Sequence, residues 1–488
     1  MFFKRFSSSS AWTLPQTIRQ ILSSGQQPAS NIHVNGWVKS VRRQKNVTFV
    51  VINDGSCISG LQAVLTNNSS PTLHALTNGA SVRMTGSIVA SRGSGQAKEL
   101  QVDAVEVLGE CNPETYPIQK QALSVEYLRD HAHLRPRTDT NASMLRLRSA
   151  LLKSLHDFFE RHDFCYAHTP ILTASDCEGA GETFRVTPSS TPSLVSPSHT
   201  FPPGSPPPDH HSEFFSHPAY LTVSSQLHLE ALVSSLARIY TLSPCFRAEP
   251  SQTNRHLAEF WMLEAEWAWT RGVDDVCRLV EACAKHALGA GGDERALLTQ
   301  GTARHEEKLS SLEAAASSEP WVRMTYTEAI AELEKYHVSA DMKARPFVFE
   351  PKWGQGLQSE HEKWLSEVLV KGPVFVTDYP SAVKPFYMRL NDDERTVACF
   401  DLLVPYVGEL VGGSLREERL DALQKRMSTH GLDPEGEEYG WYVDLRRFGS
   451  APHGGFGMGF ERLVSWVSGI ENVRECIAMP RWAKRMLL

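Results

Sequence analysis

The hydrophobic pattern of this chain changes its period once, and the change constrains the fold more than any other feature. Residues 33–108 hold five short segments rich in β-branched side chains and separated by Gly, Ser and Asn, a pattern that predicts strands. From Met144 onwards apolar residues recur at three- and four-residue steps, which predicts an amphipathic helix. Five strands in about 75 residues are typical of a small OB-type barrel. We therefore expect an α+β protein of at least two domains, and a length of 488 residues agrees.

Breaks in composition divide the chain further. Pro113, Pro117 and Pro136 mark a linker, and a Pro/Ser/His-rich tract at 187–218 cannot bury enough apolar surface to order itself. This tract is expected to be a flexible insertion; the alternative is a polyproline stretch that binds a partner. Residues 272–345 are expected to form a mainly helical insertion. The expected units are a leader at 1–30, the barrel at 31–110, the linker at 111–140 and a second domain at 141–488.

The N-terminus has the composition of a mitochondrial transit peptide. Asp and Glu are absent from Met1 to Asn53, and the opening MFFKRFSSSSAW combines Lys4 and Arg5 with aromatic residues and a serine run. We expect a leader that directs the chain to the mitochondrial matrix. The alternative is a tail followed by a short helix, LPQTIRQIL, that belongs to the mature protein.

Composition argues against several classes of protein. No stretch of about 18 apolar residues occurs, so no membrane span is expected. The nine cysteines include no CxxC pair, which argues against a structural zinc site and is typical of a reducing compartment. The net charge is −7, so a nucleic acid partner would have to be bound by local basic patches.

Backbone motifs that bind phosphate are also missing. The chain contains no Gly-Lys dipeptide and so no GxxxxGK[ST] loop, and GGFGMG at 454–459 does not satisfy GxGxxG. A nucleotide, if one is bound, must be held by side chains. The best candidates lie in FRAEPSQTNRHLAEFWMLEAE, from Phe246 to Glu266, which predicts two antiparallel strands joined by a polar loop. Arginine suits phosphate oxygens and an aromatic face suits a nucleobase, although an exposed hairpin with solvated ion pairs would have the same composition.

This segment resembles the second signature of the class II aminoacyl-tRNA synthetases, and closely that of their asparaginyl branch. Two further signatures stand in the required order. Residues 144–162 followed by FCYAHTPILTAS resemble the first, and HGGFGMGFERLV at 453–464 resembles the third. The resemblance covers about residues 33–186 and 219–488. It implies an OB-fold anticodon-binding domain followed by a catalytic domain built on an antiparallel sheet.

The resemblance also implies an ATP site. Arg247 would grip the α-phosphate, Phe260 would stack on adenine and Arg462 would contact the γ-phosphate side. Asp401 and Glu409 match the acidic pair that carries Mg²⁺ with ATP, and hard oxygen ligands suit that ion; the alternative is a solvated loop of ion pairs. Their spacing is one residue longer than in the aspartyl enzymes, which weakens the assignment of Asp401. The complete expected ATP set is Arg247, Glu249, Arg255, His256, Phe260, Glu409 and Arg462, with Arg247 and Arg462 catalytic.

The same resemblance points to L-asparagine as the amino acid. Glu178, in the hinge-like loop DCEGAGETF, would meet the α-ammonium group, and Gln226 would touch the substrate. Where the aspartyl enzymes carry a lysine, this chain has Leu229 followed by Glu230. A Glu230 carboxylate would accept the amide N–H of asparagine and repel aspartate, at a cost of ~4 kcal/mol for like charges about 4 Å apart. The expected asparagine set is Glu178, Gln226, Glu230, Arg416 and His453.

The barrel is expected to read the anticodon of tRNA(Asn). The segment WVKSVRRQKNVTFVVINDGSCISGLQAVL resembles the OB domain shared by the aspartyl, asparaginyl and lysyl enzymes. Phe49 would stack on the central uracil and Gln62 would hydrogen-bond it. Arg42, Arg43 and Lys45 would supply local positive charge, since OB folds hold single strands by stacking and a basic track. The alternative places Phe49 in the barrel core.

The expected reaction is ATP-dependent ligation of asparagine to tRNA(Asn) through an asparaginyl-adenylate. The resemblance implies a homodimer with Pro170 at the interface. Two rival functions remain open: an aspartyl or relaxed-specificity enzyme, and a catalytically inactive relative that only binds or regulates. The Leu-Glu pair in place of the lysine argues against the first, and the complete set of ATP-binding side chains argues against the second.

Overall fold

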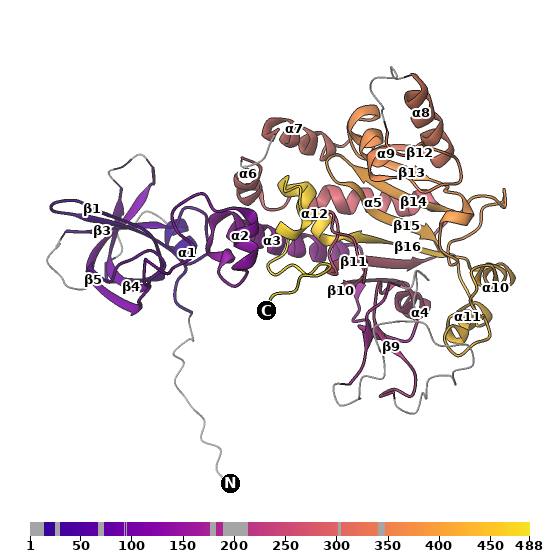
Figure 1. Cartoon of the computed structure of the whole chain (residues 1–488), viewed down its shortest axis with the longest axis horizontal. Helices are drawn as coiled ribbons and strands as arrows, with labels where there is room; N and C mark the ends of the chain where they lie inside the picture. Colours follow the sequence, from indigo (N-terminus) through magenta and orange to yellow (C-terminus); the bar gives the residue numbers. More distant parts are fainter. Residues whose placement is uncertain are drawn as a thin grey trace, which may run out of the picture. The chain divides into compact units, whose positions relative to one another are not determined.

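The computed structural model describes residues 14–24, 30–66, 73–91, 93, 95–175, 182–188, 213–300, 304–339 and 347–488 (Figure 1). The chain divides into two compact units, Met1–Ser143 with Leu488 and Met144–Leu487. The first is built on a barrel and the second on a large sheet with helices, which confirms the predicted α+β class. Within the described residues, no helix is both long enough and apolar enough to cross a membrane.

The first unit contains the predicted five-stranded barrel. Its strands close in the order β1-β2-β3-β5-β4. They span Ile32–Arg43 (β1), Thr48–Asn53 (β2), Leu61–Leu65 (β3), Ser81–Ala90 (β4) and Lys98–Gly109 (β5). Along β2, β3 and β4 buried side chains alternate with more exposed ones, so that Val50, Ala63 and Val82 meet in one core.

A short helix from the predicted leader packs on this barrel. Helix α1 (Ile18–Ser23) buries Ile18 and Ile21 in the barrel core. The Asp54 carboxylate accepts a 2.8 Å hydrogen bond from the amide of Ile18, and Lys98 Nζ donates to a carbonyl of the last turn at 3.0 Å. An acidic group at the helix N-terminus and a basic group at its C-terminus also match the helix dipole. Helix α1 is therefore part of the folded unit, as the alternative interpretation of LPQTIRQIL held.

The predicted linker belongs to the first unit as well. It contains helix α2 (Val125–Asp130), a 3-10 turn (Arg135–Arg137) and the beginning of helix α3 (Asp139–Arg161). Residues 1–13 of the predicted leader and 189–212 of the Pro/Ser-rich tract lie outside the described residues.

The second unit is built around an eight-stranded sheet of order β12-β13-β14-β15-β16-β11-β10-β6. Its strands are antiparallel except for the pairs β12–β13 and β6–β10. They span Cys165–Tyr166 (β6), Arg238–Phe246 (β10), Glu259–Ala268 (β11), Val322–Thr325 (β12), Val374–Thr377 (β13), Cys399–Val404 (β14), Gly408–Leu415 (β15) and His453–Gly459 (β16). The pair β10–β11 is the hairpin predicted around the polar loop. A small sheet comprises Leu172–Thr173 (β7), Ala219–Leu221 (β9) and Arg185–Val186 (β8).

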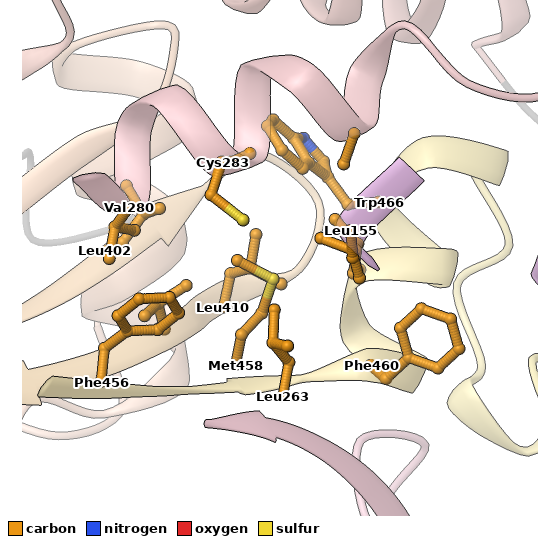
Figure 2. Packing of buried hydrophobic residues seen from close by; sticks show 14 of the residues in the cluster. Leu155, Leu263, Val280, Cys283, Leu402, Leu410, Phe456, Met458, Phe460 and Trp466 are labelled. Carbon is orange, nitrogen blue, oxygen red and sulfur yellow. The ribbon is translucent and has the colours of Figure 1, made fainter. Parts of the chain in front are cut away.

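Helices cover one face of the large sheet. Leu155 of α3, Cys283 of α5 and Trp466 of α12 pack with Leu263 of β11 and Met458 of β16 in one hydrophobic cluster (Figure 2). The helices after α3 span Gln226–Leu236 (α4), Val273–Leu288 (α5), Gly292–Gln300 (α6), His305–Ala315 (α7), Tyr326–Ser339 (α8), Ser359–Lys363 (α9), Leu420–Thr429 (α10), Gly440–Arg447 (α11) and Phe460–Ser468 (α12). On β11 and β16 the apolar side chains thus face these helices, whereas β13 and β14 are apolar on both faces, because Val374, Val376, Cys399 and Leu403 belong to a second hydrophobic cluster.

The segment 272–345 is mainly helical but is not set apart from the core. Helix α5 repeats small apolar residues at three- and four-residue steps, and these side chains pack in the cluster that covers the sheet. Strand β12, from the same segment, pairs with β13 at the edge of the sheet. The sequence pattern predicts helices here, but periodicity alone does not show whether a helix is inserted or central.

Candidate active site

Alternation along the strands opens a cavity of about 530 Å³ on the sheet face opposite the helices. On β11, Leu263 belongs to the hydrophobic cluster, whereas Met262, Glu264 and Glu266 line the cavity; Ala265 belongs to the cluster and also borders the cavity. The remaining lining residues include Ser224, Gln226, Leu229, Arg247, Ala382, Val383, Lys384, Pro385, Tyr387, Met388, Asp401, Glu409, Gly412, Gly413, Arg416, His430 and Gly457. One strand therefore serves the core with one set of side chains and the cavity with the other.

Glycines of β16 keep this face open. Phe456 and Met458 pack in the hydrophobic cluster, and Gly455 and Gly457 alternate with them. A Cβ atom at Gly455 would lie 2.1 Å from Oε2 of Glu266, which is closer than atoms can approach. The GGFGMG sequence therefore leaves room for buried carboxylates on the cavity side of a strand, and this explains glycines that do not form a phosphate-binding loop.

Four of the predicted ATP-binding side chains converge at one end of the site. The guanidinium carbon of Arg247 lies 5.4 Å from the centre of the Phe260 ring. Arg462 Nη1 donates to the Glu409 carbonyl at 2.8 Å and lies 3.4 Å from Oε2 of the same residue. Burial opposes ionisation of Glu409, but the charges of Arg462, Lys384 and Arg247 outweigh burial and hold its pKa below the ordinary value. This end therefore combines an aromatic face with cations and an ionised carboxylate.

The other three predicted ATP residues lie beside this group. Glu249 carboxylate oxygens lie 3.3 Å from His256 Nε2 and 3.9 Å from Arg247 Nη1. Burial lowers the pKa of His256 in spite of the nearby Glu249 charge. Arg255 donates to Glu362 at 3.0 Å and lines a neighbouring cavity of about 370 Å³ instead of the main one.

A buried ion pair forms the other end of the cavity. Arg416 donates to Glu266 through Nε at 3.1 Å and through Nη2 at 2.9 Å, and its Nη1 donates to Ser414 Oγ at 2.7 Å. Arg416 and Glu266 line the cavity although both are almost completely buried. Gln226 and Leu229 of α4 line it as well. A guanidinium, a carboxylate, an amide and an apolar side chain suit a small polar side chain of a substrate.

Glu230 lies beside this cavity in a network of buried hydrogen-bond donors, and its predicted contact with asparagine stays a prediction. Its Oε2 accepts hydrogen bonds from Tyr442 at 2.7 Å, Arg446 at 2.7 Å and His453 at 3.1 Å, and its Oε1 accepts one from Gln226 at 3.1 Å. Burial would raise the pKa of Glu230, but Arg446 and His453 outweigh burial and hold it well below the ordinary range. The Glu230 carboxylate is thus fixed in place next to Gln226, whose side chain donates to it and lines the cavity.

Three other predicted residues are placed as follows. His453 lies with Glu230, and its Nδ1 is 2.8 Å from the Ala451 carbonyl; its predicted contact with asparagine stays a prediction. Glu178 lies outside the described residues. Pro170 is exposed next to the exposed side chains of Ile171 and Leu172.

Lys384, which the sequence did not single out, is bound to Asp401 in the cavity wall. Its Nζ donates to Oδ1 at 2.9 Å and to Oδ2 at 2.8 Å, and lies 4.0 Å from the centre of the Tyr379 ring. Burial opposes the charge of Lys384, but Asp401 outweighs burial and raises its pKa. A Cβ atom at Gly412 would lie 3.5 Å from a Glu409 oxygen and 3.7 Å from an Asp401 oxygen. Both oxygens of Asp401 are committed to Lys384, so of the predicted metal pair Glu409 is the better ligand.

Glu264 is a second residue that the sequence analysis missed. Its carboxylate accepts hydrogen bonds from the Ser224 hydroxyl and, at 2.9 Å, from the Ser225 amide, and burial raises its pKa. A signal existed, because Glu264 and Glu266 stand two residues apart in a run that is otherwise apolar from Phe260 to Ala268, and must share one face. Lys384 lies in an irregular segment, where no periodicity could have revealed it.

The predicted anticodon residues lie on the barrel of the first unit. Phe49 of β2 is half-buried and belongs to none of the hydrophobic clusters of the described residues, which argues against the alternative that it is core. It stands opposite Arg42 of β1, whose guanidinium carbon lies 4.8 Å from the ring centre. Gln62 of β3 faces Val51 in the register and lies 3.4 Å from a Glu99 carboxylate oxygen.

Comparison with known proteins agrees with this geometry. Residues 124–483 match a family model described as class II tRNA synthetases (D, K and N), and residues 32–108 match one described as an OB-fold nucleic acid binding domain. The asparagine–tRNA ligase of Thermosynechococcus vestitus is 45% identical over 474 residues, which cover 96% of this chain and 98% of the relative. That of Legionella pneumophila is 45% identical over 481 residues, covering 95% and 97%.

Solved structures show the same likeness. The asparaginyl-tRNA synthetase of Pyrococcus horikoshii, complexed with asparaginyl-adenylate, is similar with a TM-score of 0.79 and 29% identity, covering 97% of this chain and 100% of that chain. The asparaginyl-tRNA synthetase of Entamoeba histolytica is similar with a TM-score of 0.77 and 27% identity, covering 93% of this chain and 96% of that chain.

Proposed function

This chain belongs to the class II asparaginyl-tRNA synthetases, and we propose on that premise that it activates L-asparagine with ATP and transfers it to tRNA(Asn). The observation that carries the proposal is the arrangement of two ends in one cavity. Arg247 and Glu409 line one end and the Arg416–Glu266 pair lines the other, on a single sheet face. ATP and a small polar amino acid can thus be held side by side, as formation of an adenylate requires.

The first step joins asparagine to the α-phosphate of ATP. A carboxylate oxygen of asparagine attacks the α-phosphorus, the bond to the bridging oxygen breaks, and pyrophosphate leaves with the electron pair. Arg247 binds the α-phosphate, Phe260 stacks on adenine, and Arg462 faces the outer phosphates. Fixed cations at these places stabilise the charge that develops on the phosphate oxygens, and no covalent bond to the protein is needed.

The second step transfers asparagine to tRNA. The terminal ribose hydroxyl attacks the carbonyl carbon of the adenylate, the hydroxyl proton is lost, and AMP leaves. The barrel holds the anticodon through Phe49, Arg42 and Gln62, because stacking on an aromatic face and a basic neighbour are the usual means by which OB folds bind single strands.

Choice of asparagine is assigned to the Arg416–Glu266 pair. The Arg416 guanidinium donates to the amide oxygen, and the Glu266 carboxylate accepts the amide N–H. Aspartate offers no N–H, and its carboxylate would meet the Glu266 charge at close range. Leu229 supplies no cation that could offset this repulsion, and Glu264 is placed to accept the α-ammonium group.

Mg²⁺ is proposed as the ion that accompanies ATP, with Glu409 as its protein ligand. The Glu409 carboxylate fits this role, because it lines the cavity and has a pKa held below the ordinary value. Mg²⁺ commonly takes one or two carboxylates together with substrate phosphates. When bound, the ion would neutralise phosphate charge; Asp401 contributes only if it releases Lys384.

A homodimer is proposed through the surface around Pro170. Tyr166, Ile171 and Leu172 expose 39–42% of their surface close to this residue in the sequence. Neighbouring apolar side chains that remain exposed are characteristic of association surfaces. Sedimentation at micromolar concentration tests the proposal, and a monomer would refute it.

The mitochondrial matrix is proposed as the location, with a leader that ends before Leu14. The acid-free, serine-rich N-terminus supports import. Removal of residues through 30 would take away α1, which buries Ile18 and Ile21 in the barrel core. Processing therefore has to leave this helix in place.

Pyrophosphate exchange with each of the twenty amino acids tests the proposed function. We expect exchange with asparagine above all others, and charging of tRNA(Asn) by the same preparation. Equal exchange with aspartate would favour a relaxed enzyme, and no exchange with any amino acid would favour an inactive relative.

A further inference from the structure

Lys384 is a cation of the cavity for which the reaction as described has no use. Among the described residues that line the cavity, the Lys and Arg side chains are Arg247, Lys384 and Arg416. Arg416 is committed to Glu266 and Ser414. Arg247 lies beside the adenine-stacking ring of the ATP end. Lys384 is thus the lining cation that neither substrate group described so far engages.

The position of Lys384 is intermediate between the two ends of the cavity. It belongs to a stretch of wall that also contributes Tyr387, whose ring lies 5.4 Å from the guanidinium carbon of Arg416 at the amino acid end. In the other direction the Lys384 charge influences both Asp401 and Glu409, the carboxylates next to the ATP end. A substrate group at the junction of asparagine and ATP would therefore lie near this ammonium.

Two anionic groups must meet at the junction of asparagine and ATP, and an ammonium group there would reduce the repulsion between them. The α-carboxylate of asparagine and the α-phosphate of ATP are both anionic and must approach within bonding distance. Arg247 is assigned to the phosphate, which leaves the carboxylate without a partner. Two like charges in a site of low dielectric repel strongly, so a cation placed between them lowers the barrier to attack.

We propose that Lys384 is a catalytic residue that binds the α-carboxylate of asparagine, and that Asp401 is a positioning residue that holds Lys384. The proposal rests on the proposed function. Of the three N–H donors of an ammonium group, the observed contacts with Asp401 use two, and a third remains for the carboxylate. Lys384 stays protonated throughout: the carboxylate oxygen gives its electron pair to phosphorus, pyrophosphate carries the leaving pair away, and no proton moves.

Comparison of asparagine with asparaginol, which has an alcohol in place of the carboxylate, tests the contact directly. The wild-type enzyme should bind asparagine more tightly than asparaginol, and in Lys384→Gln this preference should fall by about 10-fold or more. Single-turnover adenylate formation should slow by about 100-fold in the same variant. An unchanged preference for asparagine would overturn the proposal, because a lysine with a merely structural role would not distinguish the two ligands.

The double variant Lys384→Gln/Asp401→Asn separates chemistry from folding. Lys384→Gln alone leaves Asp401 buried without its partner and lowers the thermal midpoint, whereas the double variant removes the unpaired charge and should regain stability. We expect it to remain slow in adenylate formation. Recovery of the wild-type rate would overturn the proposal. Absence of asparagine exchange in the wild-type enzyme would instead refute the proposed function.

Discussion

Arg446 and Glu230 meet through a 2.7 Å hydrogen bond between Nη2 and Oε2, and neither side chain has any surface exposed to solvent. Arg446 lies on α11 and Glu230 on α4, so the bond joins two helices distant in sequence. Tyr442 and His453 donate to the same oxygen, and Gln226, which lines the cavity, donates to the other. This network links Glu230 to the amino acid end of the cavity.

This arrangement predicts that Glu230→Gln costs stability and shifts specificity together. Loss of the carboxylate leaves Arg446 buried without its counter-charge, which costs about 3–5 kcal/mol of unfolding free energy. Removal of a negative charge near Arg416 should also increase kcat/KM for aspartate relative to asparagine. Urea unfolding and exchange assays with both amino acids measure the two effects.

Glu461→Gln provides the matched control. Glu461 is a buried carboxylate that accepts a 2.8 Å hydrogen bond from Arg148, and it does not line the cavity. The ratio for the two amino acids should stay at the wild-type value in this variant, because Glu461 does not line the cavity. A similar ratio in Glu230→Gln would show that discrimination is independent of Glu230.

Arg247 and Arg462 together form the proposed clamp on the ATP phosphates, and they give a second prediction. Arg247→Ala and Arg462→Ala should each slow adenylate formation by at least ~100-fold, as removal of one transition-state donor does in other enzymes. Arg238→Ala, at the exposed start of the strand that leads to Arg247, is the control and should be active. Near-normal pyrophosphate exchange in either clamp variant would mean that ATP binds elsewhere.

The raised pKa of Glu264 leads to a third prediction, that part of the folding stability depends on pH and that removing this carboxylate affects stability and asparagine binding in opposite directions. Its pKa is raised in the folded state by burial, so between 4.5, the value of an unperturbed glutamate, and the folded pKa the folded chain binds the extra proton. Stability therefore falls as pH rises from 4.5 through the folded pKa, and the penalty is fully present above the folded pKa. Glu264→Gln should raise the thermal midpoint there while weakening asparagine binding.

The sign of this effect can be checked by acidification. Below the unperturbed value both states carry the proton, so the advantage of Glu264→Gln should disappear there. Glu160→Gln, at an exposed position of α3, should change the midpoint at neither pH. An advantage that is equal at both pH values would show that it does not arise from ionisation.

The fourth prediction is that substitutions on the barrel weaken tRNA charging and leave amino acid activation unchanged. Phe49→Ala should lower kcat/KM for tRNA charging by about 5–150-fold, since stacking contributes ~1–3 kcal/mol per base. Arg42→Ala should also weaken charging and reduce its salt dependence. Asparagine-dependent exchange should be unchanged in both. Arg83→Ala, an exposed arginine paired with Glu106 on the barrel, is the control; equal losses there would rule out a specific surface.

The leader supplies the fifth prediction. A fusion of residues 1–30 to a fluorescent protein should enter mitochondria, and the imported full-length chain should have its N-terminus before Leu14. Ile21→Ala should destabilise the full chain by about 2–5 kcal/mol, because Ile21 is buried in the barrel core. A diffuse cytosolic signal would refute import, and a mature N-terminus after Ser23 would refute a structural role for α1.

The sequence by itself determined the elements and the chemistry that each one carries. Five short β-branched segments separated by turn residues over 33–108 predict the barrel, and the β10–β11 hairpin follows from two apolar runs around a polar loop. The side-chain period of two along a strand places Glu264 and Glu266 on one face. These properties are local, so a linear pattern contains them.

Only the tertiary structure decided which charged groups are free to meet a substrate. The sequence predicts an anion at Glu230, and only the fold shows that Arg446, 216 residues away, binds its carboxylate. Asp401 was predicted to bind metal, yet Lys384 from an irregular segment occupies both of its oxygens. A buried charge is costly without a partner, so its orientation follows whichever opposite charge the fold brings near, and that partner leaves no periodic trace in the sequence.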